Sequence, residues 1–184
     1  YAARLWWVLR WLGHDAVAVL DGGWDAWTRL KLPMTQVAPA VKPGRFHPRT
    51  SADVTMSAGH IAAHIGQSQP LLVDARSPDR YRGENETLDA VAGHIPGAVN
   101  RFFRLNLESD GRFKPPTELR REFSSALGTV PATAVVHYCG SGVTACHNLL
   151  AMEIAGLAGS RLYPGSWSEW CSDPSRPVAT GSSP

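Results

Sequence analysis

Apolar and polar positions alternate along residues 51–184 in the way that α/β proteins require. Short continuous apolar runs predict buried strands, and segments with a helical spacing of apolar positions predict helices. Helices are expected at residues 55–67, 115–128, 142–156 and 165–170, and strands at residues 70–76, 132–138 and 160–163. Between the first two strands, a polar loop is expected at residues 77–93 and a turn followed by a strand at residues 94–100. Because strands alternate with helices, the pattern predicts an α/β domain of three layers around a mostly parallel central sheet.

The chain repeats itself at an offset of 143 residues. Residues 2–27 align without a gap to residues 145–170, so that Gly13 pairs with Gly156 (156 − 13 = 143). In both copies a helix ends at glycine, a short apolar strand follows, and a G-G/S-W-x-x-W motif opens another helix. A period this long is typical of two homologous domains in tandem rather than of a solenoid.

The repeat divides the chain into three predicted parts. Residues 1–32 would be the helix–strand–helix end of a first domain, with Val17 to Leu20 as its strand, and the chain is expected to be truncated inside that domain. Residues 33–50 contain four prolines without helical spacing and are predicted to be a linker. Residues 51–184 would be a complete second domain. The apolar helix of the first part would either lack its sheet or dock on the second domain.

Composition narrows the classes of function. The 184 residues are 43% hydrophobic and 18% charged, with a net charge of +2, which favours neither nucleic acid nor a membrane surface as partner. No apolar run is long enough to predict a transmembrane helix, and no signal peptide is visible. Three cysteines without zinc-site spacing indicate a reducing compartment, and a cytoplasmic location is expected.

The segment C-G-S-G-V-T begins directly after the predicted strand 132–138 and leads into a helix. Gly140 and Gly142 allow a tight turn, in which successive N–H groups can converge on an anion. The N-terminus of the following helix adds a favourable dipole. Both features stabilise a thiolate, the nucleophilic form of cysteine, and therefore make Cys139 a candidate nucleophile rather than a packing residue.

Two chemistries use a cysteine in front of such an anion-binding loop. Phosphoryl transfer requires an arginine six residues after the cysteine to hold the phosphate. That position is Ala145, which disfavours a phosphatase. Sulfur transfer through a persulfide has no such requirement.

The motifs C-G-S-G-V-T-A, V-D-A-R-S-P-D-R-Y-R-G-E, G-H-I-P-G-A-V-N and G-S-W-S-E-W together resemble the tandem-domain rhodanese-like sulfurtransferases over nearly the whole chain. The C-G-S-G-V-T loop is similar to that of the 3-mercaptopyruvate branch. Thiosulfate-preferring relatives usually have basic residues at the positions of Gly140 and Ser141.

The resemblance implies a role for each matched position. Cys139 would accept sulfur as a persulfide, within a loop of Gly140, Ser141, Gly142, Val143 and Thr144. Ser141 would relay protons, although its hydroxyl could equally cap the following helix. Arg80 would bind the substrate anion, although it could also be a surface arginine. A second arginine, frequent in the mercaptopyruvate branch, is absent from residues 84–93.

The resulting hypothesis is a sulfurtransferase that moves sulfane sulfur from 3-mercaptopyruvate to a thiol or cyanide. A small thiol or a thioredoxin-like protein could be the acceptor, and no metal or organic cofactor is implied. Thiosulfate is the alternative donor, and an inert rhodanese-like binding module is the alternative from another class. Of the remaining motifs, Ser166 and Glu169 have the spacing of a helix capping box.

Overall fold

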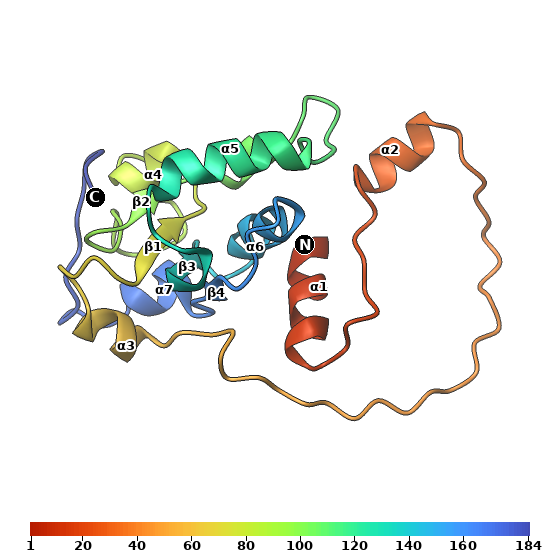
Figure 1. Cartoon of the computed structure of the whole chain (residues 1–184), viewed down its shortest axis with the longest axis horizontal. Helices are drawn as coiled ribbons and strands as arrows, with labels where there is room; N and C mark the ends of the chain where they lie inside the picture. Colours follow the sequence, from red (N-terminus) through yellow and green to blue (C-terminus); the bar gives the residue numbers. More distant parts are fainter.

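The computed structural model describes residues 1–184 and confirms the α/β class (Figure 1). Four parallel strands form one sheet in the order β2-β1-β3-β4. The strands are β1 (Leu71–Asp74), β2 (Val99–Asn100), β3 (Val135–Tyr138) and β4 (Arg161–Leu162). The helices are α1 (Ala2–Trp11), α2 (Gly23–Arg29), α3 (Ala58–Ala63), α4 (Pro78–Arg82), α5 (Pro116–Leu127), α6 (Ala145–Ile154) and α7 (Ser166–Trp170), with short 3-10 turns η1 (Phe103–Asn106) and η2 (Ala132–Ala134).

Helices cover both faces of the sheet, as the alternation of strands and helices predicts. Neighbouring residues of a strand point to opposite faces. Leu72 and Val136 pack into a core with residues of α3, α4 and α7. Val73 and Val135 pack on the other side, with residues of α5 and α6. The sheet is therefore the middle of three layers (Figure 1).

The helix expected from residue 55 starts three residues later. Met56 donates its N–H to the carbonyl of Leu162 at 2.8 Å, and Thr55 forms a parallel bridge with the same residue. These two residues extend the edge of the sheet instead of a helix. Ser57 then caps α3 by accepting a hydrogen bond from the N–H of His60.

Helix α4 lies inside a segment that the sequence predicts to be a loop. Pro78 occupies its first turn, and Gly83 ends it in the left-handed conformation, with φ of 82°. A proline at the start and a glycine at the end are ordinary helix boundaries. The five residues between these boundaries are mostly charged and contain too few apolar positions to predict a helix.

The sequence repeat has a counterpart in the packing of α1 against α6. The bounds of α1, shifted by 143 residues, are those of α6. Trp6 and Trp7 of α1 are 8% and 7% exposed and join the cluster that contains Leu149 of α6. Arg10 and Glu153, which occupy the same position in the two copies, form an ion pair at 3.5 Å. The apolar face of α1 is therefore docked on the second part of the chain.

The prediction of a strand at residues 17–20 is wrong, because these residues do not join a sheet. No strand lies beside this segment, and the N–H of Val17 donates only to the nearby carbonyl of Asp15. An extended segment needs a neighbouring strand before it can form a ladder. The residues of this segment instead lie along the outside of the α1–α6 cluster, where Val17 and Val19 make apolar contacts.

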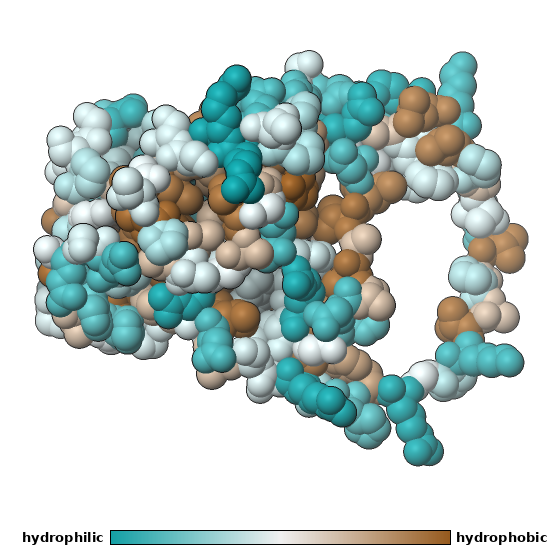
Figure 2. Space-filling model, in the orientation of Figure 1, coloured by the Kyte–Doolittle hydropathy of each residue, from teal (hydrophilic) through white to brown (hydrophobic).

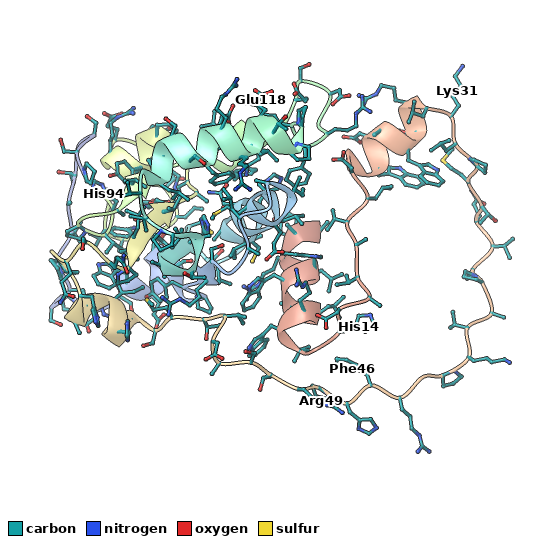
Figure 3. All side chains as sticks on the ribbon, in the orientation of Figure 1. His14, Lys31, Phe46, Arg49, His94 and Glu118 are labelled. Atoms are coloured by element: carbon teal, nitrogen blue, oxygen red, sulfur yellow. The ribbon has the colours of Figure 1, made fainter.

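Residues 33–50 contain no helix or strand and are exposed throughout. They leave α2, pass around the open side of the molecule and return beside α1 (Figure 1). On the return, the ring of Phe46 meets His14 edge-on, and the N–H of Arg49 donates to the carbonyl of Leu12 at 2.9 Å (Figure 3). Trp24 of α2 and Met34 of this segment are each 62% exposed. Figure 2 shows further apolar residues at the surface along this part of the chain. The division into a remnant, a linker and a complete domain remains a prediction.

Replacing Trp7 by alanine should loosen α1 from α6. Truncation of a buried aromatic side chain in a closed core lowers the free energy of unfolding by about 3 kcal/mol or more. Because α1 is a terminal helix and can detach from the rest of the chain, we expect a loss of no more than about 3 kcal/mol here. The change is measured as the free energy of unfolding in urea. Leu5→Ala on the same helix, where Leu5 is 60% exposed, is the matched control and should cost less than about 0.5 kcal/mol. Equal losses for the two variants would contradict the packing of α1.

Candidate active site

Cys139 is the first residue after β3, a central strand of the sheet. Parallel sheets place their sites at the carboxyl ends of strands, and β3 ends here beside β1. Cys139 is almost completely buried but borders a cavity of about 590 Å³. The cavity is lined by Tyr1, Arg80, Leu88, Asp89, Phe103, Cys139, Gly140, Ser141, Val143, Thr144 and Ser168. The structure therefore brings Arg80 and four residues of the predicted loop to one cavity with Cys139.

The orientation of the loop is set by α7. The N–H groups of Trp167 and Ser168 donate to the carbonyls of Cys139 and Gly140, each at 2.9 Å. In a trans peptide the N–H points opposite to the C=O. The N–H groups of Gly140 and Ser141 therefore point away from α7.

The amides of residues 140–144 are free donors. None of these five N–H groups has a hydrogen-bond partner in the protein. Successive unpaired amides in front of a helix N-terminus form an anion-binding concavity. The arrangement supports the expectation of a loop that can hold a sulfur anion.

The two loop glycines serve different purposes. Gly142 has φ of 74°, and a Cβ at this position would lie 2.5 Å from the carbonyl oxygen of Pro164. Only glycine fits there. Gly140 does not have positive φ, and its Cβ would meet the Arg80 guanidinium at an ordinary 3.6 Å. Position 140 therefore needs no glycine for its backbone and is open to substitution.

Arg80 lies on α4, and its guanidinium is held by two carboxylates. Glu86 accepts hydrogen bonds from Nε and Nη2 at 2.7–3.1 Å, and Asp89 lies 3.5 Å from Nη2. Nη1 has no partner in the protein. Arg80 therefore belongs to an ion-pair network that lines the cavity, and its role in binding a substrate anion stays a prediction.

Glu86 connects Arg80 to a second, buried arginine. The side chain of Glu86 is 2% exposed and lies 3.3 Å from Nη1 of Arg76. Arg76 also makes a bidentate contact to Asp74 and stacks on the Trp167 ring at 4.8 Å. Burial alone would raise the pKa of Glu86, but hydrogen bonds from Arg80 and from the Leu88 N–H outweigh it, so that its pKa is lowered.

The sequence did not predict that Glu86 and Asp89 belong to the site. Both lie in an irregular polar segment whose charges could pair in several ways, and no motif marks them. The excess of acidic residues over arginines at residues 84–93 was the only available signal.

Ser141 is exposed at the cavity, and its hydroxyl forms no hydrogen bond with the protein. The alternative that Ser141 caps the next helix is wrong. That helix, α6, has Thr144 as its N-cap residue, without a side-chain hydrogen bond. The hydroxyl is therefore free to meet a bound molecule.

The other two cysteines lack the environment of Cys139. The thiol of Cys146 donates to the carbonyl of Gly142 at 3.3 Å, and burial raises its pKa to about 11. Burial also raises the pKa of the Cys171 thiol. Neither thiol lines the Cys139 cavity.

The chain belongs to the rhodanese family: residues 57–173 match the family model described as "Rhodanese-like domain". It is 51% identical over 182 residues to a probable 3-mercaptopyruvate sulfurtransferase of Pseudomonas aeruginosa, covering 98% of this chain and 64% of the relative. It is 36% identical to the human 3-mercaptopyruvate sulfurtransferase, covering 92% of this chain and 57% of the relative. The chain thus spans less than two thirds of the length of these curated relatives.

A thiosulfate sulfurtransferase of Bos taurus is 35% identical over 173 residues, covering 92% of this chain and 58% of that protein. Among solved structures, the anaerobic ergothioneine biosynthesis enzyme from Chlorobium limicola has a TM-score of 0.86 at 25% identity, covering 98% of this chain and 45% of that one. This last likeness concerns the fold.

Two further features concern metal binding and membrane crossing. No three histidine, cysteine or carboxylate side chains lie close enough together to hold a metal ion. None of the helices has the length and apolar character that crossing a membrane requires.

Proposed function

We propose that the chain carries the catalytic site of a sulfurtransferase, with Cys139 as the sulfur carrier and 3-mercaptopyruvate as the donor. The observation that carries the proposal is the row of five unpaired N–H groups that follows Cys139 at a cavity. Relatives named as 3-mercaptopyruvate and thiosulfate sulfurtransferases support the same class of reaction.

The reaction has two steps. The Cys139 thiolate attacks the donor sulfur, a new S–S bond forms, and the donor C–S bond breaks with its electron pair going to carbon. The proton of the donor thiol replaces sulfur on that carbon, so that pyruvate leaves and a persulfide anion remains. An acceptor thiolate or cyanide then attacks the outer sulfur, and the S–S bond breaks to restore the Cys139 thiolate.

The cavity residues have distinct roles in this proposal. The amides of Gly140, Ser141, Gly142, Val143 and Thr144 stabilise the persulfide anion. The Ser141 hydroxyl carries the proton from the donor sulfur to carbon. Arg80 presents Nη1, its unpaired nitrogen, to one carboxylate oxygen of the donor.

The proposal is tested by steady-state rates with 3-mercaptopyruvate and with thiosulfate, using cyanide as acceptor and thiocyanate as the detected product. Turnover with mercaptopyruvate is expected to have the higher kcat/KM. An absence of both turnover and persulfide formation would favour the inert binding module. That alternative is disfavoured because a module without chemistry has no need of unpaired amides beside a cysteine at a cavity.

Thiosulfate is the second candidate donor because one group of relatives carries its name. Glu86 and Asp89 offset much of the Arg80 charge, which weakens attraction for a dianion relative to a monoanion. The site therefore favours mercaptopyruvate. A thiosulfate enzyme would need additional positive charge in the loop.

Adding that charge should change the donor. In a Gly140→Arg/Ser141→Lys variant, each new charge-assisted contact to thiosulfate contributes about 1.5–3 kcal/mol. The ratio of kcat/KM for thiosulfate to that for mercaptopyruvate should rise by at least about tenfold. At position 140 the backbone does not require glycine, and an added Cβ meets the Arg80 guanidinium at an ordinary 3.6 Å. A Gly140→Ala/Ser141→Ala variant controls for side-chain bulk and for loss of the Ser141 hydroxyl. An equal change of the ratio in both variants would show that donor choice does not depend on loop charge.

A further inference from the structure

The first residue of α7 has an unusual backbone conformation. Ser166 is completely buried and has φ of 54°. Lys31, which is exposed, is the only other non-glycine residue with positive φ. The left-handed region places Cβ against the backbone, so a buried serine keeps this conformation at a cost in free energy that glycine avoids.

The repeat supplies an internal comparison. Position 166 corresponds to Gly23 (166 − 23 = 143), which has φ of 59°. Helix α2 begins at Gly23 as α7 begins at Ser166. The same backbone turn is thus made by glycine in one copy and by serine in the other. Because glycine makes the same turn in the first copy, the turn does not require serine. The reason for the serine must therefore lie in a contact of its side chain.

The Ser166 hydroxyl has two hydrogen bonds, and one of them reaches Cys139. It donates to the carbonyl of Tyr163 at 2.9 Å and accepts from the N–H of Cys139 at 3.2 Å. The expected capping box is therefore wrong: Gly165 is the N-cap residue of α7, without a side-chain hydrogen bond, and Ser166 points toward the end of β3 instead.

Ser166 and its neighbour fix Cys139 from both sides. Ser166 holds the N–H of Cys139, and the N–H of Trp167 holds its carbonyl. Both peptide groups of Cys139 are therefore clamped, and χ1 alone decides where its sulfur points. The clamp also directs the unpaired N–H of Gly140 away from α7.

We propose that Ser166 is a positioning residue for Cys139, whose hydroxyl orients the backbone so that the sulfur faces the unpaired amides of residues 140–144. The inference rests on the proposed role of Cys139 as nucleophile. It explains why a buried, conformationally unfavourable serine stands where the first copy has glycine.

The test is Ser166→Gly in the whole chain. Glycine adopts the required φ without strain, so the fold is retained and the melting temperature stays within about 5 °C of the original value, because relief of strain offsets the lost hydrogen bonds. The rate of Cys139 alkylation by iodoacetamide at pH 7, followed by peptide mass spectrometry, is expected to fall at least about tenfold, since small displacements of reacting groups cost up to about a hundredfold. In sulfur transfer, kcat should fall by a similar factor while the donor KM changes less than about twofold.

Two further variants separate positioning from stability. Gly23→Ser adds the same side chain at the matched position, where an added Cβ meets nothing within 4 Å. It should lower the melting temperature and leave Cys139 alkylation unchanged. Ser166→Ala keeps the strain and loses the hydroxyl, so it should melt lower than Ser166→Gly and show the same slow alkylation.

If folded Ser166→Gly keeps the alkylation rate and the kcat of the unsubstituted chain, the inference is overturned. If that variant does not fold, Ser166→Ala decides in the same way. Alkylation needs no sulfur donor. A chain that alkylates at Cys139 but transfers no sulfur would therefore count against the proposed function and not against the role of Ser166.

Discussion

Replacing Cys139 by serine is expected to abolish persulfide formation and to lower sulfur transfer by at least about a thousandfold, since removal of a nucleophile leaves only binding to assist the reaction. The serine hydroxyl keeps the size of the side chain but cannot accept sulfur at neutral pH. The measurement is mass spectrometry after donor treatment, in which the original chain should gain about 32 Da, one sulfur atom, on the reactive thiolate.

Cys146→Ser and Cys171→Ser are the matched controls, and both should retain the added sulfur. With its pKa raised to about 11, the Cys146 thiol is ionised in roughly one molecule in ten thousand at pH 7. Cys171 also has a raised pKa and lies outside the Cys139 cavity. An added sulfur that survives in Cys139→Ser, or disappears in Cys146→Ser, would move the nucleophile away from Cys139.

The candidate nucleophile could be found from the sequence because its chemistry is local. The end of β3, Gly142 and the start of α6 lie within a few residues of Cys139, so the sequence itself places them together. The same holds for the class of fold, since the alternation of apolar strands with helices follows from short-range periodicity. In both cases the interacting groups are neighbours in the chain.

The support of the site could not be found in this way because it depends on distant segments. Ser166 is 27 residues from Cys139 in sequence and meets it only because β4 pairs with β3 and α7 follows. Its spacing to Glu169 predicted a capping box, a local interaction that the bond to Cys139 displaced. The strand expected at residues 17–20 failed for the same reason, since a strand depends on a neighbour that its own sequence does not contain.

Glu86 shows how far such non-local pairing determines the site. Its carboxylate is buried between Arg76 and Arg80, and Asp74 on β1 and Asp89 complete the network. Arg76 in turn lies on the Trp167 ring, next to the residue that clamps Cys139. A change at Glu86 therefore affects both the core under the loop and Arg80, the arginine that lines the cavity.

Glu86→Ala is expected to lower the free energy of unfolding by about 3–5 kcal/mol, because it leaves a buried arginine partly uncompensated. The measurement is urea denaturation at pH 7. Glu84→Ala is the matched control two residues away. Glu84 forms an equally short pair with Arg82, but the Glu84 side chain is 57% exposed and that of Arg82 is 33% exposed, so its loss should cost less than about 1 kcal/mol. Similar losses in the two variants would contradict the buried network.

The pH dependence separates the charge of Glu86 from its packing. Because its folded-state pKa lies below the ordinary value of 4.5, the ionised carboxylate contributes its full stability above that pH and loses it as the pH falls through the lowered pKa. Glu86→Gln, which keeps the shape and removes the charge, should therefore be less stable than the original chain at pH 7. The difference should shrink as the pH falls below about 4, where the glutamate of the original chain also becomes protonated. A difference that is constant from pH 7 to pH 3 would mean that hydrogen-bond geometry, and not charge, ties Arg80 to the core.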